Sequence, residues 1–167
     1  MDLRRICIHE AGHFYVALLH RPSRALSICI SPKRRRDTAT GESYISAGRA
    51  TTFDPSDSLP GVQVRIRAAG LAAESLAYLE PFDVLMHDPD VLFGIKTDTD
   101  LAREDLEKAG LPASRERDFH FYWRIGFYDA VSMMQDSQYN LHRIADYCID
   151  NLGRDVPRAE IIAACGL

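Results

Sequence analysis

The stretch from Leu3 to His20 constrains the fold more than any other part of the chain. It contains no proline, it is followed at once by Arg21 and Pro22, and it is apolar on more than one side. A segment of this length without a helix breaker is predicted to form an α-helix that ends at the Arg-Pro pair. Because its apolar residues are not confined to one stripe, we expect this helix to be buried on more than one side.

A His-Glu-x-x-His motif lies inside this predicted helix, with His9, Glu10 and His13 at its defining positions. Histidines four residues apart are offset by about 40° and rise about 6 Å along a helix, so His9 and His13 can share a metal ion. Imidazole binds Zn²⁺ at about 2.0–2.1 Å, and a catalytic zinc site keeps one position for water beside three protein ligands. Glu10 can take the proton of that water as a general base. The alternative is that the two histidines are ordinary helix residues.

A third ligand must come from outside the motif, because its helix neighbours offer no suitable side chain and Cys7 faces away from His9. Spacing alone does not select one. The candidates are His20, Glu74, His87, Asp98, Asp100, His120 and His142.

The rest of the chain predicts a mainly α fold with minor β structure. Alternating segments at 25–31 and 43–46 predict a hairpin with the basic run Lys33–Arg36 near its tip, and an edge strand at 25–32 could bind an extended peptide. We expect a loop at 48–61, and we expect the aromatic residues between 119 and 128 to pack in the core. Further helices are predicted at 62–79, 99–109, 114–135, 137–151 and after Pro157.

Composition limits the class of protein. A chain of 167 residues fits a single domain spanning 1–167, and a net charge of -4 gives no bulk attraction to nucleic acid or anionic membranes. No apolar run is long enough to span a bilayer, and we expect no signal peptide. The four cysteines form no Cys-x-x-Cys pair, which favours reduced thiols and a cytoplasmic location.

Several segments occur in an order that resembles the peptidase domain of FtsH-type zinc proteases. They are the motif at 9–13, the strand at 25–32, the Ala-Gly-Leu-Ala-Ala-Glu segment at 69–74, the segment at 98–102 and the closing helix around 139–147. The likeness covers most of the chain, although only the His-Glu-x-x-His motif is individually specific. It implies a helical zinc-peptidase domain with a small hairpin or sheet beside the metal-binding helix.

The same resemblance implies Asp100 as the third ligand, because the family uses an aspartate at the start of a helix. Helical phase favours a different residue. The apolar stripe of the predicted helix consists of Ala102, Leu106 and Ala109. Asp98 extends this stripe by four residues, although a residue before the helix need not follow its phase. The resemblance outweighs the phase, so Asp100 is the expected ligand and Asp98 the alternative. A further alternative is that both aspartates only cap the helix.

Other positions bear on function through the resemblance. Glu74 matches a family glutamate and is expected to orient a ligating histidine, unless it is an ordinary helix-face carboxylate. Leu71 stands where the family usually has arginine, and Glu104-Asp105 stands where it usually has a small residue followed by threonine. These departures put substrate handling in question more than zinc binding.

We therefore expect a zinc-dependent metalloendopeptidase that cleaves peptides or unfolded proteins. The ligands would be His9, His13 and Asp100, with Glu10 as the general base. The sequence contains no phosphate-binding loop, so by itself it would act without ATP, and the resemblance implies a separate ATPase partner and a homo-oligomer. The alternative is a zinc-binding interaction or regulatory module of the same fold that cleaves nothing.

Overall fold

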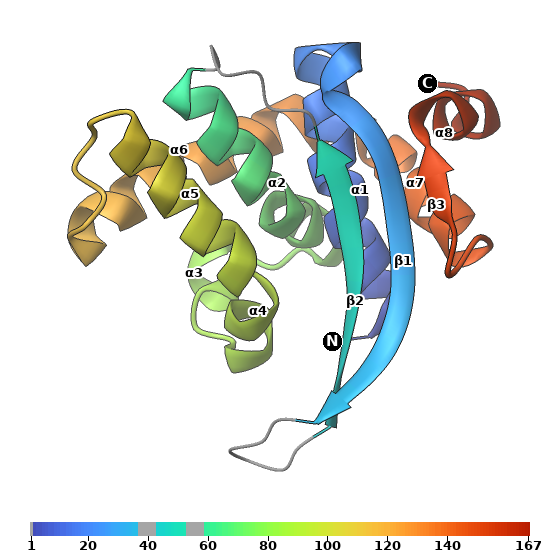
Figure 1. Cartoon of the computed structure of the whole chain (residues 1–167), viewed down its shortest axis with the longest axis horizontal. Coiled ribbons are helices and arrows are strands. Elements are labelled where there is room, and N and C mark those ends of the chain that lie inside the picture. The colour runs from blue at the N-terminus through green and yellow to red at the C-terminus, as the bar shows by residue number, and fades with distance from the viewer. Residues whose placement is uncertain (1, 37–42, 53–58) are drawn as a thin grey trace.

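Helices surround α1 in the computed structural model, and a small sheet lies across one side of it (Figure 1). The structure describes residues 2–36, 43–52 and 59–167. The helices are α1 (Leu3–His20), α2 (Pro60–Tyr78), α3 (Phe82–Leu85), α4 (Pro89–Gly94), α5 (Lys96–Lys108), α6 (Glu116–Met134), α7 (Gln138–Ile149) and α8 (Arg158–Cys165). The strands are β1 (Ala25–Arg36), β2 (Ser43–Thr52) and β3 (Asp155–Pro157). The predicted fold class, mainly α with minor β, is confirmed.

Helix α1 is the central element. Its N-terminus is capped by Asp2, whose carboxylate accepts a hydrogen bond from the Arg5 backbone N–H at 2.7 Å. Every residue from Ile6 to Ala17 is buried. The helix is therefore enclosed on all sides along three turns, as its lack of a single apolar stripe predicts.

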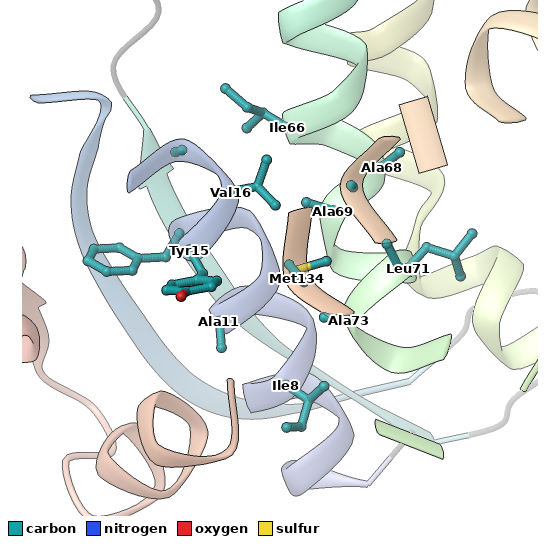
Figure 2. Close-up of a cluster of buried hydrophobic side chains, with 14 of the residues drawn as sticks. Ile8, Ala11, Tyr15, Val16, Ile66, Ala68, Ala69, Leu71, Ala73 and Met134 are labelled. Atoms are coloured by element: carbon teal, nitrogen blue, oxygen red, sulfur yellow. The ribbon is translucent and has the colours of Figure 1, made fainter. Parts of the chain in front are cut away.

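Helices α1 and α2 approach each other closely because small residues line their contact (Figure 2). A Cβ atom added to Gly12 would lie 2.4 Å from the Ala69 carbonyl oxygen and 2.6 Å from the Ala73 Cβ. Only glycine fits at this crossing. The alanine-rich composition of α2 thus serves close helix packing, and it brings the polar side chains of the two helices within reach of one another.

The sheet is antiparallel, with β1 in the middle of the order β2-β1-β3. Ile28 pairs with Ala50 on one side and with Val156 on the other. The predicted hairpin is confirmed, although β1 continues to Arg36 through the predicted polar connection and β2 continues to Thr52 into the predicted loop. The rest of the predicted connection, up to residue 42, lies outside the described residues. The expectation that 25–32 is an edge strand is wrong, because the short strand β3 pairs with β1 at residues 27–29, and β2 and β3 form the two edges of the described sheet.

Helix α6 carries the aromatic run, and its periodicity divides that run between two environments. Phe119, Trp123 and Phe127 are buried, and Phe119 stacks on Trp123 with ring centroids 5.9 Å apart. In contrast, 62% of Phe121 and 46% of Tyr128 remain exposed. The expectation of core packing is correct for the first three and wrong for these two, because they lie on the outward face of the same helix.

Candidate metal centre

Three side chains from two helices converge on one point. His9 and His13 come from α1, and Asp98 comes from the first turn of α5. The two Nε2 atoms lie 3.0 Å apart, and Asp98 Oδ2 lies 3.1 Å from that of His9 and 3.3 Å from that of His13. The histidines are buried, and the Asp98 side chain is 17% exposed. These three residues form a group that could hold a metal ion.

Asp98, and not Asp100, completes this group. Helix α5 begins at Lys96, three residues earlier than predicted, so Asp98 is already helical and follows the phase of the buried Ala102 and Leu106. Two residues later in the helix, Asp100 points elsewhere and is exposed. Asp98 therefore replaces Asp100 as the candidate third ligand. Because the helix already includes residue 98, the helical phase that aligns Asp98 with Ala102 and Leu106 applies to it.

The second ring nitrogen of each histidine fixes which atom faces the centre. His13 Nδ1 lies 2.7 Å from the backbone carbonyl oxygen of Ile66, which can only accept a hydrogen bond. His9 Nδ1 lies 2.7 Å from Glu74 Oε1. Both Nδ1 atoms therefore donate, and in the neutral rings both Nε2 atoms present a lone pair to the centre.

Glu74 is the residue that orients His9, as the resemblance implied. Its side chain is completely buried, with one oxygen on His9 Nδ1 and the other on the Arg5 guanidinium. Burial raises the pKa of Glu74, but the hydrogen bonds and charges of His9 and Arg5 outweigh burial and lower it. The carboxylate is accordingly ionised and acts as an acceptor for the His9 ring, an arrangement typical of metal-binding histidines.

The electrostatics of the centre favour a cation. Burial lowers the pKa of His9, but the hydrogen bonds with Asp98 and Glu74 outweigh burial and raise this pKa well above its ordinary value. Burial also raises the pKa of Asp98, but His13 and His9 outweigh it, and the carboxyl titrates below its ordinary range. A raised pKa of His9 and a lowered pKa of Asp98 both mean that these groups stabilise a positive charge placed between them.

The spacing of the three atoms fits a metal ion of the size of zinc. With bonds of about 2.0–2.1 Å, neighbouring ligand atoms in a tetrahedral zinc site are about 3.3 Å apart. The three separations in this centre are 3.0, 3.1 and 3.3 Å. Two imidazole nitrogens and a carboxylate oxygen this close together need positive charge between them, supplied either by a proton on a ring or by a metal ion. The donor atoms and their spacing fit a zinc ion.

Gly70 on α2 makes room for the His9 ring. A Cβ at this position would lie 2.4, 2.5 and 2.6 Å from Nε2, Cε1 and Cδ2 of His9. Since the three distances are nearly equal, the methyl group would press on the face of the ring rather than on its edge. Sequence reasoning placed Gly70 only in a segment of small residues, because which glycine faces His9 depends on how α2 packs on α1.

Glu10 follows His9 on α1, and strand β2 holds its carboxylate. Its side chain is buried, and Oε2 accepts a hydrogen bond of 2.6 Å from the Ala50 backbone N–H. A Cβ on Gly48 would lie 2.5 Å from both Cγ and Oε1 of Glu10. The edge strand therefore passes close over the carboxylate, a contact that the sequence alone did not reveal.

The remaining candidates have other surroundings. His20 contacts Arg65 at 3.1 Å and His120 pairs with Glu116 at 3.2 Å. Neither these two histidines nor His87 or His142 belongs to the metal-binding group found among the described residues. At the positions that depart from the FtsH-type pattern, Leu71 is buried in the core, and Asp105 forms an ion pair of 3.6 Å with Arg67.

Comparisons with known proteins add no family to these findings. No protein-family model matches the chain, and no curated protein matches it either. Among the described residues, no helix combines the length and apolar character needed to cross a membrane.

Proposed function

We propose that this chain is a zinc metallopeptidase that hydrolyses peptide bonds with Glu10 as general base. The observation that carries the proposal is the convergence of two histidine lone pairs and one Asp98 carboxylate oxygen at distances of 3.0–3.3 Å. Without a metal, the cluster would need a proton shared between His9 and Asp98, whereas one metal ion can bind all three atoms at once. A glutamate follows the first of these histidines directly, which is the position of the base in such sites.

Each residue has a defined task in this reaction. Zinc bound at the centre would polarise the scissile carbonyl and make water a competent nucleophile at neutral pH. His9, His13 and Asp98 would hold the ion, and Glu74 keeps the His9 ring oriented. Glu10 takes the proton of the attacking water and transfers it to the leaving amine. These roles need one carboxylate for metal binding and a different one for proton transfer.

The substrate we propose is an extended peptide or an unfolded protein. Strand β2 is one of the two edge strands of the described sheet, and it contacts Glu10 through Ala50. An extended chain can add to such an edge by main-chain hydrogen bonds, which recognise backbone rather than side chains. The resemblance to FtsH-type peptidases supports the same substrate class, and it also supports a separate ATPase partner and a homo-oligomer. The four free cysteines agree with a reducing, cytoplasmic location.

Metal content and proteolysis together test the proposal. Purified chain should contain about one zinc per molecule by mass spectrometry and should cleave an unstructured protein such as casein. Glu10→Gln should keep the zinc and lose activity by about 10²–10⁴-fold, the usual contribution of a general base. The proposal fails if the wild type and Glu10→Gln cleave at the same rate.

The contact between Glu10 and β2 supports a second candidate function, a zinc-binding module that cleaves nothing. In this reading the hydrogen bond from Ala50 N–H keeps Glu10 as a structural residue that joins α1 to the sheet. Stoichiometric zinc without any Glu10-dependent cleavage, over a range of unfolded substrates, would favour this module over the peptidase.

A further inference from the structure

A line of charged side chains leads outward from the metal centre. Glu74 joins His9 to the guanidinium of Arg5, whose Nε is its partner. The other end of the guanidinium, Nη2, donates to Glu80 Oε2 at 2.7 Å. The order from the centre outward is therefore His9, Glu74, Arg5 and Glu80, and the proposed mechanism uses only the first two.

Position in the helix explains why Arg5 reaches the site. Arg5 lies four residues before His9, as His9 lies four residues before His13, so one face of α1 presents the three side chains in a row towards α2. The Arg5 side chain is 16% exposed, and its guanidinium lies over the ring of Tyr78, 5.3 Å from the ring centroid. Tyr78 is the last residue of α2, so this helix supplies two of the partners of the guanidinium, Glu74 and Tyr78.

The C-terminus of α2 also fixes Glu80. Leu79 ends the helix in a left-handed conformation with φ of 57°, and the Glu80 backbone N–H then donates to the Ser75 carbonyl oxygen at 3.2 Å. In return, the Ser75 hydroxyl donates to the Glu80 carbonyl oxygen at 2.6 Å. The backbone at Glu80 is thus held on both sides, and its carboxylate meets Arg5 from a fixed point.

A fully buried carboxylate needs a compensating partner for each oxygen. Glu74 has no exposed side-chain surface, and His9 occupies one of its oxygens. If Arg5 were absent, the second oxygen would keep its negative charge in the interior without a donor, which is strongly unfavourable. The carboxylate would then rotate, take up a proton or admit water, and each change would weaken its hold on the His9 ring.

We propose that Arg5 is a positioning residue for the metal centre, acting through Glu74 to hold His9 in its zinc-binding orientation. The inference rests on the zinc site of the proposed function but not on peptide hydrolysis. A planar guanidinium suits this place because its fork contacts Glu74 and Glu80 at the same time, whereas an ammonium group is a point charge. Glu80 in turn keeps the guanidinium aimed at Glu74.

The test is the zinc affinity of the purified chain, measured by competition with a chromophoric chelator. Arg5→Met should weaken zinc binding by about 10–100-fold, the usual effect of removing a group behind a ligating histidine. Arg4→Met is the matched control, since Arg4 is the neighbouring arginine and pairs with Asp146 in an ion pair that is about half exposed. This control should bind zinc like the wild type. Equal affinities of Arg5→Met and Arg4→Met would overturn the inference.

A double-mutant cycle separates action through Glu74 from a general loss of structure. In a Glu74→Gln background, adding Arg5→Met should weaken zinc binding no further, because Arg5 has lost the charge through which it acts. Additive losses would contradict the proposal. Arg5→Lys should recover part of the affinity, since an ammonium can still meet Glu74.

Two further measurements separate a folding defect, and a failure of the proposed peptidase, from a failure of the inference. Thermal unfolding of the zinc-free variants reports whether they fold, and if Arg5→Met does not, Glu80→Gln replaces it: weaker zinc binding supports the inference and unchanged binding overturns it. If zinc affinity depends on Arg5 but no peptide is cleaved, the proposed peptidase fails and the inference stands. A wild-type chain that binds no zinc overturns both.

Discussion

Helices α1 and α6 are of similar length, but their buried residues differ in kind and in pattern. In α1, every residue from Ile6 to Ala17 is buried, including His9, Glu10 and His13. In α6, burial follows the helical period, with Trp123 inside and Phe121 outside. The central helix thus places polar groups in the interior, whereas the peripheral helix buries one apolar face.

This difference suggests that α6 contributes mainly to stability and that α1 carries the candidate functional site. Buried polar groups are unfavourable unless each has a partner, and the centre on α1 has its Nε2 lone pairs and the Asp98 carboxylate directed at one another. The apolar face of α6 has no such demand. We therefore expect substitutions in the core face of α6 to reduce stability with the site intact, and substitutions around α1 to affect the site first.

The largest effect on stability is expected at Trp123. Trp123→Ala removes a fully buried ring that stacks on Phe119, and such truncations destabilise a protein by about 3–5 kcal/mol. Phe121→Ala, two residues earlier on the exposed face, should change the free energy of unfolding by less than about 0.5 kcal/mol. Urea unfolding measures both. Similar losses from the two substitutions would contradict the division of α6 into a core face and an outer face.

The next effect concerns the ion itself. Zinc that binds only the folded chain should stabilise it by about 2.7 kcal/mol when free zinc is held at 100 times the Kd. Asp98→Asn should lose this zinc-dependent stabilisation, and Asp100→Asn should keep it, because Asp98 faces the two histidines and Asp100 is exposed. Unfolding with and without a chelator gives the comparison. Loss in Asp100→Asn with retention in Asp98→Asn would return the third ligand to Asp100.

The choice between these aspartates shows what the sequence can predict. Helical phase with Ala102 and Leu106 favours Asp98, and it applies because α5 begins at Lys96. The helix start was predicted at Thr99, since Asp and Thr are typical of caps and the preceding segment has no clear period. An error of three residues in a helix boundary was therefore enough to make the phase argument seem inapplicable.

The parts of the site that lie on α1 were accessible from the sequence because one helix fixes their relative positions. His9 and His13 need only the helical repeat, and the motif names the base. Gly70, Arg5 and Ala50 were not accessible, since their roles depend on how α2 and β2 pack against α1. Pairings between distant segments carry no local signal. For the same reason the short strand β3, which makes β1 central in the sheet, was missed.

A smaller effect is expected from Gly70→Ala. The added methyl group would collide with the His9 ring at 2.4–2.6 Å, and overpacking of this kind costs about 1–3 kcal/mol. Because the ring must shift, zinc affinity should fall as well. Gly61→Ala is the control on the same helix, since nothing lies within 4 Å of its added Cβ, and it should keep the wild-type zinc affinity. Unchanged zinc binding in Gly70→Ala would show that the ring position is not critical.

The smallest effect on stability is expected from Gly48→Ala, although it bears most directly on the reaction. The new methyl group would meet the Glu10 side chain at 2.5 Å, and moving the carboxylate away from β2 would weaken its hydrogen bond from the Ala50 N–H, at a cost of about 1 kcal/mol. Zinc binding should be unchanged because His9, His13 and Asp98 are untouched. If Glu10 is the general base, kcat should fall while KM stays nearly constant, since a displaced base affects the transition state alone. A peptidase with an unchanged kcat in Gly48→Ala would mean that β2 does not position the base, and that its contact with Glu10 only joins α1 to the sheet.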